Sequence, residues 1–356
     1  MASTSFLTRL YDGDFDSALF SGFRELAPSA KAVRTVQAFE ALSKRFPPEA
    51  LESAGTLSRE ILEELKNIGF FGINIPREYG GLGLNLREYL LILETVAARN
   101  IVLGFTATAH LSIGVKGILL FGTDAQKKKY LPPAAAGDSI FSYALTEPAI
   151  GSDAAHIQTR ADLSGDGTHY ILNGTKAYIT NANLAGGMTV FAQLDPEKPG
   201  YMGAFIVETD WEGVGTGREM PKMGLKASST AMVQFKDVRV PVENLLGAPG
   251  DGFKIAMTIL NYGRMALGAA SVGIMKQSLL DMKHRSETRK QFGMPINQFE
   301  LIQEKLVKAK VDSYIASAMT HFAAAQLEQD PLTAVAIESS HCKLFGTTRA
   351  WQTLYN

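Results

Sequence analysis

The segment FSYALTEPAIGSD, residues 141–153, is the stretch from which this sequence is best read. An apolar and aromatic run that includes Phe141 and Tyr143 stops at Thr146-Glu147-Pro148, where proline fixes its own φ and favours extended geometry at the residue before it. Gly151-Ser152-Asp153 then allow the chain to turn. We predict a strand that opens into a loop of free backbone amides and small hydroxyls, which suits a flat cofactor with a polar edge. The same pattern also describes an ordinary strand that ends in a proline turn.

The region before this segment, residues 1–138, reads as helical. Leu57, Ile61 and Leu65 recur at helical spacing, and Gly69 follows as a stop signal. The other expectations here are a loop over residues 75–83, helices over 87–98 and 106–121, and an end of the region at Pro132-Pro133 and Gly137-Asp138.

From residue 139 to 248 the pattern changes to that of strands. Ser164–Gly167 and Asn173-Gly174 are turn signals between short runs that favour β-structure. Strands are expected over residues 188–194, 202–208 and 231–240, and in the last of these Val233 and Phe235 alternate with polar residues as in a half-buried strand. Pro241 and the glycines of residues 247–252 end this β region.

Residues 249–356 return to a helical pattern. A long helix is expected from Phe253 to about His284, followed by a basic loop over residues 285–292. A further helix carries one apolar face made of Val307, Val311, Tyr314, Ala318 and Phe322. The chain ends at Asn356 inside a helical pattern, so we expect it to be truncated there. Together the three regions predict an α+β protein with a β-sandwich or barrel between an N-terminal helical domain and an incomplete C-terminal helical bundle.

Composition narrows the function. The 356 residues are 46% hydrophobic and 20% charged with a net charge of −1, which speaks against a dedicated nucleic-acid surface. The single cysteine, Cys342, excludes an internal disulfide, and the scattered histidines disfavour a metal centre. No apolar run approaches the roughly 18 to 20 residues needed to span a bilayer. The N-terminus resembles neither a signal peptide nor a transit peptide, so cytoplasm is the default location.

Familiar catalytic and nucleotide motifs are absent from the sequence. It contains no G-x-G-x-x-G after a strand, no P-loop, no G-x-S-x-G elbow and no H-E-x-x-H helix. This disfavours a Rossmann enzyme, a P-loop enzyme and a serine hydrolase.

Several ordered segments nevertheless resemble the acyl-CoA dehydrogenase family. Leu145–Asp153 opens the β region as in that family, and residues 173–181, NGTKAYITN, resemble its N-G-x-K-x-W-I-S/T-N segment. Residues 222–230, KMGLKASST, match K-M-G-x-K/R-x-S-x-T, and residues 235–241 match F-x-x-V-x-V-P. Arg289 with Phe292-Gly293 matches R-x-x-F-G. The agreement runs from about residue 60 to the end of the chain, and residues 110–123 and 259–270 resemble most the very-long-chain branch.

This resemblance implies the reaction and the cofactor. Family members remove the pro-R α-proton of an acyl-CoA thioester with a carboxylate while the β-hydrogen leaves as hydride to N5 of FAD, and hydrogen bonds polarise the thioester carbonyl. The product is a trans-2-enoyl-CoA of fatty-acid β-oxidation, the expected electron acceptor is an electron-transfer flavoprotein, and a homodimer or homotetramer is expected. The location would be the cytoplasm in a bacterium or the mitochondrial matrix in a eukaryote.

The site residues follow from the matching positions. The resemblance places Leu145 and Thr146 near the polar edge of the flavin, Thr180 near N5, and Tyr178 where the family usually has tryptophan. Arg289 would bind the FAD pyrophosphate of a neighbouring subunit. The full cofactor set is Tyr143, Leu145, Thr146, Gly151, Ser152, Tyr178, Ile179, Thr180, Arg289 and Phe292, and the acyl-CoA set is Ser152, Asn261, Tyr262, Gly263 and Arg264. Each has an ordinary alternative: a turn hydroxyl, a strand aromatic, a loop cation, or in Phe292 a core residue.

The catalytic base is the part of the pattern that is missing. The family carries its glutamate either in a late loop, which we expect beyond Asn356, or at the position of Gly263, which has no carboxylate. Glu147 matches the flavin loop and is not expected to be the base. The alternatives are therefore a non-catalytic scaffold or assembly relative, and an oxidase or monooxygenase acting on nitroalkanes or aromatic sulfur compounds.

Overall fold

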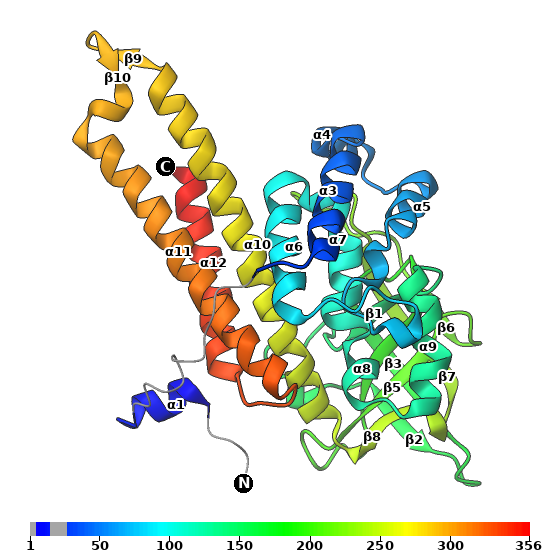
Figure 1. Cartoon of the computed structure of the whole chain (residues 1–356). Helices are drawn as coiled ribbons and strands as arrows, with labels where there is room; N and C mark the ends of the chain where they lie inside the picture. The colour runs from blue at the N-terminus through cyan, green and yellow to red at the C-terminus, as the bar shows by residue number, and fades with distance from the viewer. Residues whose placement is uncertain (1–4, 15–26) are drawn as a thin grey trace. The chain divides into compact units, whose positions relative to one another are not determined.

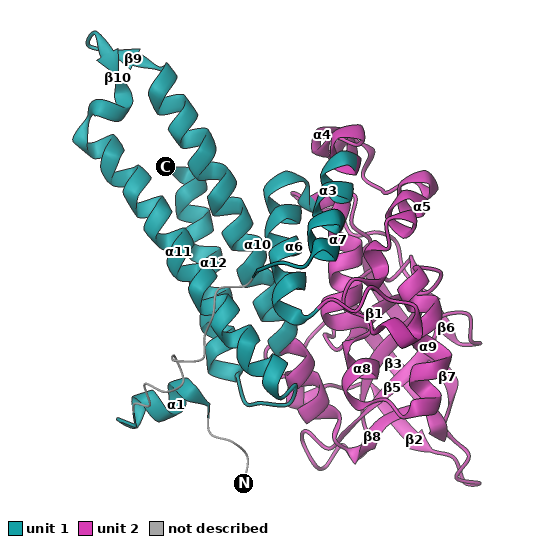
Figure 2. Cartoon of the chain, viewed as in Figure 1, with its two compact units in different colours: residues 1–41, 85–101, 261–356 teal, residues 42–84, 102–260 magenta. Residues whose placement is uncertain are grey.

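The computed structural model describes residues 5–14 and 27–356, and these fall into two compact units (Figure 2). Unit 1 comprises Met1–Ala41, Asn85–Ile101 and Asn261–Asn356, and unit 2 comprises Leu42–Leu84 and Val102–Leu260. Unit 2 contains the large sheet, whereas unit 1 is built from helices and one small hairpin (Figure 1). The predicted division into three domains, with boundaries after residues 138 and 248, is a different division of the chain and stays a prediction.

The N-terminal region is helical, as predicted. Its elements are α1 (Phe6–Tyr11), α3 (Ala30–Arg45), α4 (Pro48–Ala54), α5 (Arg59–Asn67), η1 (Phe70–Gly72), η2 (Arg77–Tyr79), α6 (Leu86–Arg99), α7 (Ile101–Ala109), η3 (His110–Gly114), α8 (Lys116–Phe121) and α9 (Asp124–Ala136). Asn85 and Thr123 cap the starts of α6 and α9 with capping boxes. In each, the side chain of the cap accepts from the backbone N–H three residues later, and the side chain of that later residue accepts from the backbone N–H of the cap.

One predicted boundary in this region is wrong. Pro132 and Pro133 lie inside α9 instead of ending it, and the helix continues to Ala136. Gly137 ends it with φ 80°, a left-handed conformation that glycine adopts without steric penalty. A Cβ at this position would also stand only 2.5 Å from the ring of Phe71.

The helical stretch Ile101–Phe121 corrects the expectation about apolar runs. It joins α7, the π-helical turn η3 and α8 into 21 residues that are long and apolar enough to cross a membrane by length and composition alone. Scattered small polar residues such as Thr106 and Ser112 hide this run in the sequence. In its most apolar window 78% of the residues are buried inside the protein, as in the core helix of a globular domain.

The centre of unit 2 is an eight-stranded sheet in the order β6-β7-β3-β2-β4-β5-β8, with β1 paired to β4. The strands are β1 (Ile140–Ala144), β2 (Arg160–Leu163), β3 (His169–Thr180), β4 (Ala185–Gln193), β5 (Met202–Glu208), β6 (Val214–Thr216), β7 (Thr230–Pro241) and β8 (Leu245–Gly250), with short turns η4 (Ala154–His156) and η5 (Val242–Asn244). β1 runs parallel to β4, whereas β3 is antiparallel to β7 over most of its length.

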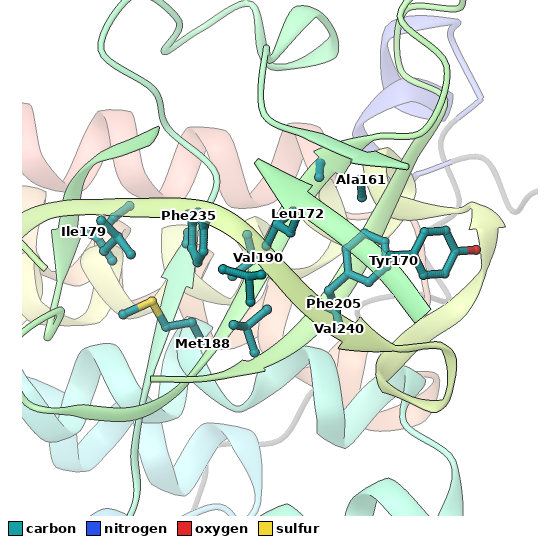
Figure 3. Packing of buried hydrophobic residues seen from close by; sticks show 14 of the residues in the cluster. Ala161, Tyr170, Leu172, Ile179, Met188, Val190, Phe205, Phe235 and Val240 are labelled. Carbon is teal, nitrogen blue, oxygen red and sulfur yellow. The ribbon is translucent and has the colours of Figure 1, made fainter. Parts of the chain in front are cut away.

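The buried faces of these strands form one hydrophobic core (Figure 3). Tyr170 and Leu172 of β3 pack in the same cluster as Val190 of β4 and Phe205 of β5, and the rings of Tyr170 and Phe205 lie 5.0 Å apart. In β7 the predicted alternation is confirmed, because Val233 and Phe235 are buried while Gln234 and Lys236 are exposed. The predicted helix–sheet–helix fold class is confirmed.

The Asn173-Gly174 turn is a wrong prediction. Both residues lie within β3, where the register with β7 shifts between Leu172 and Gly174. Gly174 is needed there because a Cβ would lie 2.5 Å from the hydroxyl of Thr159 on the neighbouring chain segment. A glycine that signals a turn thus marks a bulge and a close backbone approach.

Unit 1 contains most of α10 (Gly252–Thr288), α11 (Glu300–Gln329) and α12 (Ala336–Tyr355), together with the hairpin β9 (Lys290–Gln291) and β10 (Met294–Pro295) and the turn η6 (Ile296–Gln298). The predicted basic loop is therefore partly the last turn of α10 and partly this hairpin. Most of the predicted apolar stripe of α11 is exposed, including Val307 and Tyr314, because the helix buries small residues such as Ala316 and Thr320. Phe322, at the end of the stripe, is half-buried against Phe6.

Candidate functional site

The predicted flavin loop follows β1 directly and is held by the rest of unit 2. Glu147 and Ile150 exchange backbone hydrogen bonds of 2.9 and 3.2 Å, so Pro148 lies in a closed turn. Leu145 is buried, Thr146 is half-buried, and Ser152 is exposed. A Cβ added to Gly151 would meet no atom within 4 Å. The end of β1 therefore presents small side chains and backbone on an open loop.

Tyr143 is placed differently from the rest of this group. Its hydroxyl donates to the carbonyl of Ala256 at 3.2 Å, and its ring lies 5.0 Å from that of Phe191. The tyrosine is thus tied to the first turns of α10 and to β4, and an approach to a cofactor would use the part of the ring that these neighbours leave uncovered.

The end of β3 meets the same loop. The backbone N–H of Ala177 donates to the carbonyl of Thr146 at 2.8 Å, and the hydroxyl of Ser142 donates to the carbonyl of Thr180 at 2.8 Å. These two bonds join the segment that carries Thr146 to the segment that carries Thr180, although the two lie more than thirty residues apart in the sequence. The two segments are therefore adjacent, as one shared site would require. The roles of the individual residues stay predictions.

Tyr178 is the unusual residue of the group. It has φ 60°, and its side chain is 65% exposed between the buried Ala177 and Ile179. The register with β7 shifts here between Lys176 and Ile179. A left-handed conformation costs a residue with a Cβ roughly 1–2 kcal/mol, and such strain is often found at functional sites. The bulge thus presents an exposed aromatic ring at the end of β3, and its role at a cofactor site stays a prediction.

A buried ion pair lies directly behind this loop, and the sequence analysis did not identify it. The Nζ of Lys176 lies 2.8 Å from Oε1 of Glu147 and donates to the carbonyl of Leu145 at 3.0 Å. Glu147 also accepts from the backbone N–H of Gln158 and from both the N–H and the hydroxyl of Thr159, at 2.6 to 2.9 Å. A lysine among the apolar residues of a predicted strand is the signal that could have revealed the pair.

The charges of this pair are set by burial and by each other. Burial alone would raise the pKa of Glu147, but Lys176 and the donated hydrogen bonds outweigh burial and hold this pKa below its ordinary value. Burial lowers the pKa of Lys176 to about 8, against the stabilising effect of the carboxylate. Both groups are therefore charged at neutral pH. An ionised carboxylate that is already bound by four donors is a poor general base, which agrees with the prediction that Glu147 is not the base.

The remaining predicted residues lie in unit 1. Asn261 and Tyr262 are buried in α10: Asn261 accepts from Arg264 and from Ser339, each at 3.0 Å, and Tyr262 donates to the carbonyl of Pro331 at 2.9 Å. Gly263 and Arg264 are half-buried. Asn261 and Tyr262 are thus already bonded within the unit, which favours a structural role for their side chains.

Arg289 and Phe292 lie far from these residues along the same unit. Arg289 follows the end of α10, which places it roughly 40 Å along the helix from Asn261 at about 1.5 Å per residue. Phe292 stands at the tip of the β9–β10 hairpin with φ 53° and is 91% exposed, its ring 6.1 Å from that of Phe299. The alternative reading of Phe292 as a core residue is therefore wrong. Unit 1 does not bring its two predicted groups into one site.

Comparison with known proteins identifies the family. Three family models match in order: the N-terminal domain of acyl-CoA dehydrogenase over residues 31–138, its middle domain over 142–238, and its C-terminal domain over 250–354. The chain is 43% identical over 319 residues to human very long-chain specific acyl-CoA dehydrogenase, covering 86% of this chain and 48% of that protein. It is 34% identical over 354 residues to a probable acyl-CoA dehydrogenase, FadE10, of Mycobacterium tuberculosis, covering 97% and 54%.

Solved structures agree. Butyryl-CoA dehydrogenase from Megasphaera elsdenii superposes with a TM-score of 0.83 at 33% identity, covering 93% of this chain and 89% of that one. An acyl-CoA dehydrogenase from Bacillus anthracis, complexed with FAD, gives 0.85 at 36% identity, covering 95% and 61%. The chain spans about half the length of the curated relatives it matches. The ordered domains and these identities show that the chain belongs to the acyl-CoA dehydrogenase family.

Proposed function

We propose that this chain carries the FAD and acyl-CoA cradle of an acyl-CoA dehydrogenase that converts long-chain acyl-CoA to trans-2-enoyl-CoA. The observation that carries the proposal is the junction of the loop after β1 with the strained bulge of β3. There, hydrogen bonds join the segments that carry Thr146 and Thr180, and the ring of Tyr178 is exposed between them in the sequence.

The donors at this junction fit a flavin. Thr146, Ser152 and Thr180 each offer a hydroxyl that forms no hydrogen bond with any residue in 5–14 or 27–356. The isoalloxazine ring has an edge of oxygen and nitrogen atoms that accept or donate hydrogen bonds, and two aromatic faces that suit Tyr178 and apolar neighbours. The hydroxyls near an exposed tyrosine ring thus match the polar edge and the aromatic face of an isoalloxazine.

The chemistry divides between the cofactor and the chain. When bound, FAD supplies a hydride acceptor. We infer that Thr146 and Thr180 orient the flavin edge, that Tyr178 covers one ring face, and that Ser152 binds cofactor or substrate. Arg264 with its neighbours on α10 would contact acyl-CoA, and Arg289 with Phe292 would bind the FAD of another subunit. We do not assign Glu147 as the base, because its partners hold its carboxylate ionised.

The partners and location belong to the same proposal. We infer an electron-transfer flavoprotein as electron acceptor and a homodimer or homotetramer as the assembly. The location would be bacterial cytoplasm or mitochondrial matrix, since relatives include proteins named mitochondrial as well as bacterial ones. Chain length is the least constrained part, because relatives and structural neighbours carry both very-long-chain and butyryl names.

The proposal is tested by adding a panel of saturated acyl-CoA thioesters anaerobically to the purified, FAD-loaded native protein. We expect long-chain thioesters to bleach the visible absorption of the bound flavin. The variant Thr180→Val should bleach at least tenfold more slowly, since one transition-state hydrogen bond is removed. Ser164→Ala, in a distant β2–β3 turn, is the matched control. A colourless protein, or a flavin that no thioester bleaches, would favour a non-catalytic relative.

A further inference from the structure

We propose that Lys176 is a positioning residue for the flavin, and that its ammonium orients and strengthens the Thr146 N–H through the peptide that joins Leu145 to Thr146. The inference rests on the proposed function, because it assumes that this N–H meets the polar edge of a bound flavin. It adds a residue that makes no direct contact with the cofactor but sets the donor that does.

The ammonium is held in one place. The side chain of Lys176 is 0% exposed, and its Nζ donates to the carbonyl of Leu145 at 3.0 Å and to Oε1 of Glu147 at 2.8 Å. Burying a lysine and a glutamate together carries a desolvation penalty that an apolar pair of similar size would avoid. A buried pair at this position is therefore weak support for stability as its purpose.

The peptide geometry transmits the charge. The chain has no cis peptide bonds in its described part, so the Leu145 C=O and the Thr146 N–H point in opposite directions from the same planar unit. The ammonium that binds the carbonyl thus fixes the direction of the N–H on the far side. A cation on the carbonyl also polarises the peptide and makes its N–H a stronger donor, as in hydrogen-bond chains. The next peptide is fixed as well, because the Thr146 carbonyl accepts from Ala177.

Glu147 stabilises the charged form of Lys176 and holds its ammonium in place. Its carboxylate is anchored by Gln158 and Thr159 as well as by Lys176, so the ammonium cannot move without losing its partner. Lys176 also stands two residues before Tyr178, whose positive φ needs surrounding contacts to hold it. One buried group therefore connects the polar-edge loop with the strained bulge that carries the exposed ring.

The experiment measures the two-electron reduction potential of bound FAD by anaerobic titration with a reference dye. The double variant Lys176→Met with Glu147→Gln removes the cation without leaving a lone buried charge. Reduction places negative charge at the polar edge of the flavin, so a weaker Thr146 donor disfavours the reduced form. We expect the equilibrium constant for reduction to fall roughly tenfold, a shift of about 30 mV to lower potential. Lys176→Gln with Glu147→Gln, which keeps a polar side chain behind the loop, serves if the first variant does not fold.

Controls separate the possible outcomes. Lys276→Met removes a half-exposed lysine from a buried glutamate in unit 1 and should leave the potential unchanged. If the double variant binds FAD with the wild-type potential and visible spectrum, the pair is only a structural element and the inference is wrong. A wild-type protein that binds no FAD would instead overturn the proposed function, and the inference with it.

Discussion

Each unit contains a buried glutamate paired with a lysine, and the two pairs differ in how far the lysine is exposed to solvent. Glu147 of unit 2 meets Lys176, whose side chain is 0% exposed, and its remaining partners are backbone and hydroxyl donors. Glu94 of unit 1 is equally buried, but it meets Lys276, which is 51% exposed, and the Nε2 of His321 at 3.1 Å. Both carboxylates are satisfied. Only the first pair is sealed from water.

The difference in exposure suggests that buried charge stabilises one unit and helix packing the other. Sealed charges interact strongly and are costly to leave unpaired, whereas a half-exposed ammonium is screened by solvent. Around Glu94 the backbone itself is close: a Cβ on Gly273 of α10 would lie 1.9 Å from the Glu94 carbonyl oxygen of α6. We therefore expect unit 2 to depend on its buried charges near the flavin loop, and unit 1 to depend more on close helix packing.

The largest expected effect comes from removing one lysine from each pair. Lys176→Met leaves the Glu147 carboxylate buried without its cation and should lower the free energy of unfolding by about 3–5 kcal/mol. Lys276→Met should lower it by only about 1 kcal/mol, because its ammonium is half in water and His321 still faces Glu94. Urea unfolding followed by circular dichroism measures both. Equal losses for the two variants would contradict the contrast between a sealed and an open pair.

The second effect is a pH dependence of the stability of unit 2, which we expect from its buried His110. His110 is 0% exposed; its Nδ1 accepts from the Phe141 N–H at 2.8 Å, and its Nε2 lies 3.2 Å from the Ala134 carbonyl. Burial lowers the pKa of His110 from 6.5 to about 4, and the hydrogen bond with the Ala134 carbonyl opposes part of this shift. Between these pH values the unfolded chain binds a proton that the folded chain does not, so stability falls as the pH falls.

The loss for His110 should approach about 3 kcal/mol when the pH is lowered from about 7 to about 4, at roughly 1.4 kcal/mol per pKa unit. Unfolding free energies of the wild type and of His110→Gln over this range measure it, and the variant should show a flatter slope whatever its starting stability. His156→Gln, at an exposed histidine, is the control and should keep the wild-type slope. An unchanged slope in His110→Gln would show that other groups carry the acid sensitivity.

The smallest of the three effects tests the packing in unit 1. Alanine is the better helix former by about 1 kcal/mol, yet Gly273→Ala should destabilise by about 1–3 kcal/mol because its methyl group meets backbone that cannot move aside. Gly224→Ala is the control, since a Cβ there meets nothing within 4 Å. Thermal unfolding measures both. A neutral or stabilising Gly273→Ala would mean that α10 and α6 can separate without penalty, and that the charges around Glu94 carry more of the order than proposed.

Local pattern was enough to predict many elements, because periodicity and turn chemistry act over a few residues. The alternation in β7 and the strand Met202–Glu208 both follow from neighbours in sequence. The errors lie where distant chain segments decide. Gly174 is a bulge because Thr159 stands beside it, and the stripe from Val307 to Tyr314 is exposed because α11 buries its small residues instead.

The same division applies to the candidate site. The sequence by itself determined the family, the order of helices and strands, and the segments that carry Thr146, Tyr178 and Thr180, since these are encoded in short ordered motifs. Only the tertiary structure decided that Lys176 and Glu147 meet behind the FSYALTEPAIGSD loop and that Tyr178 has a left-handed backbone. The physical reason is that side-chain pairing and backbone strain depend on which segments are packed together, and no local pattern records that.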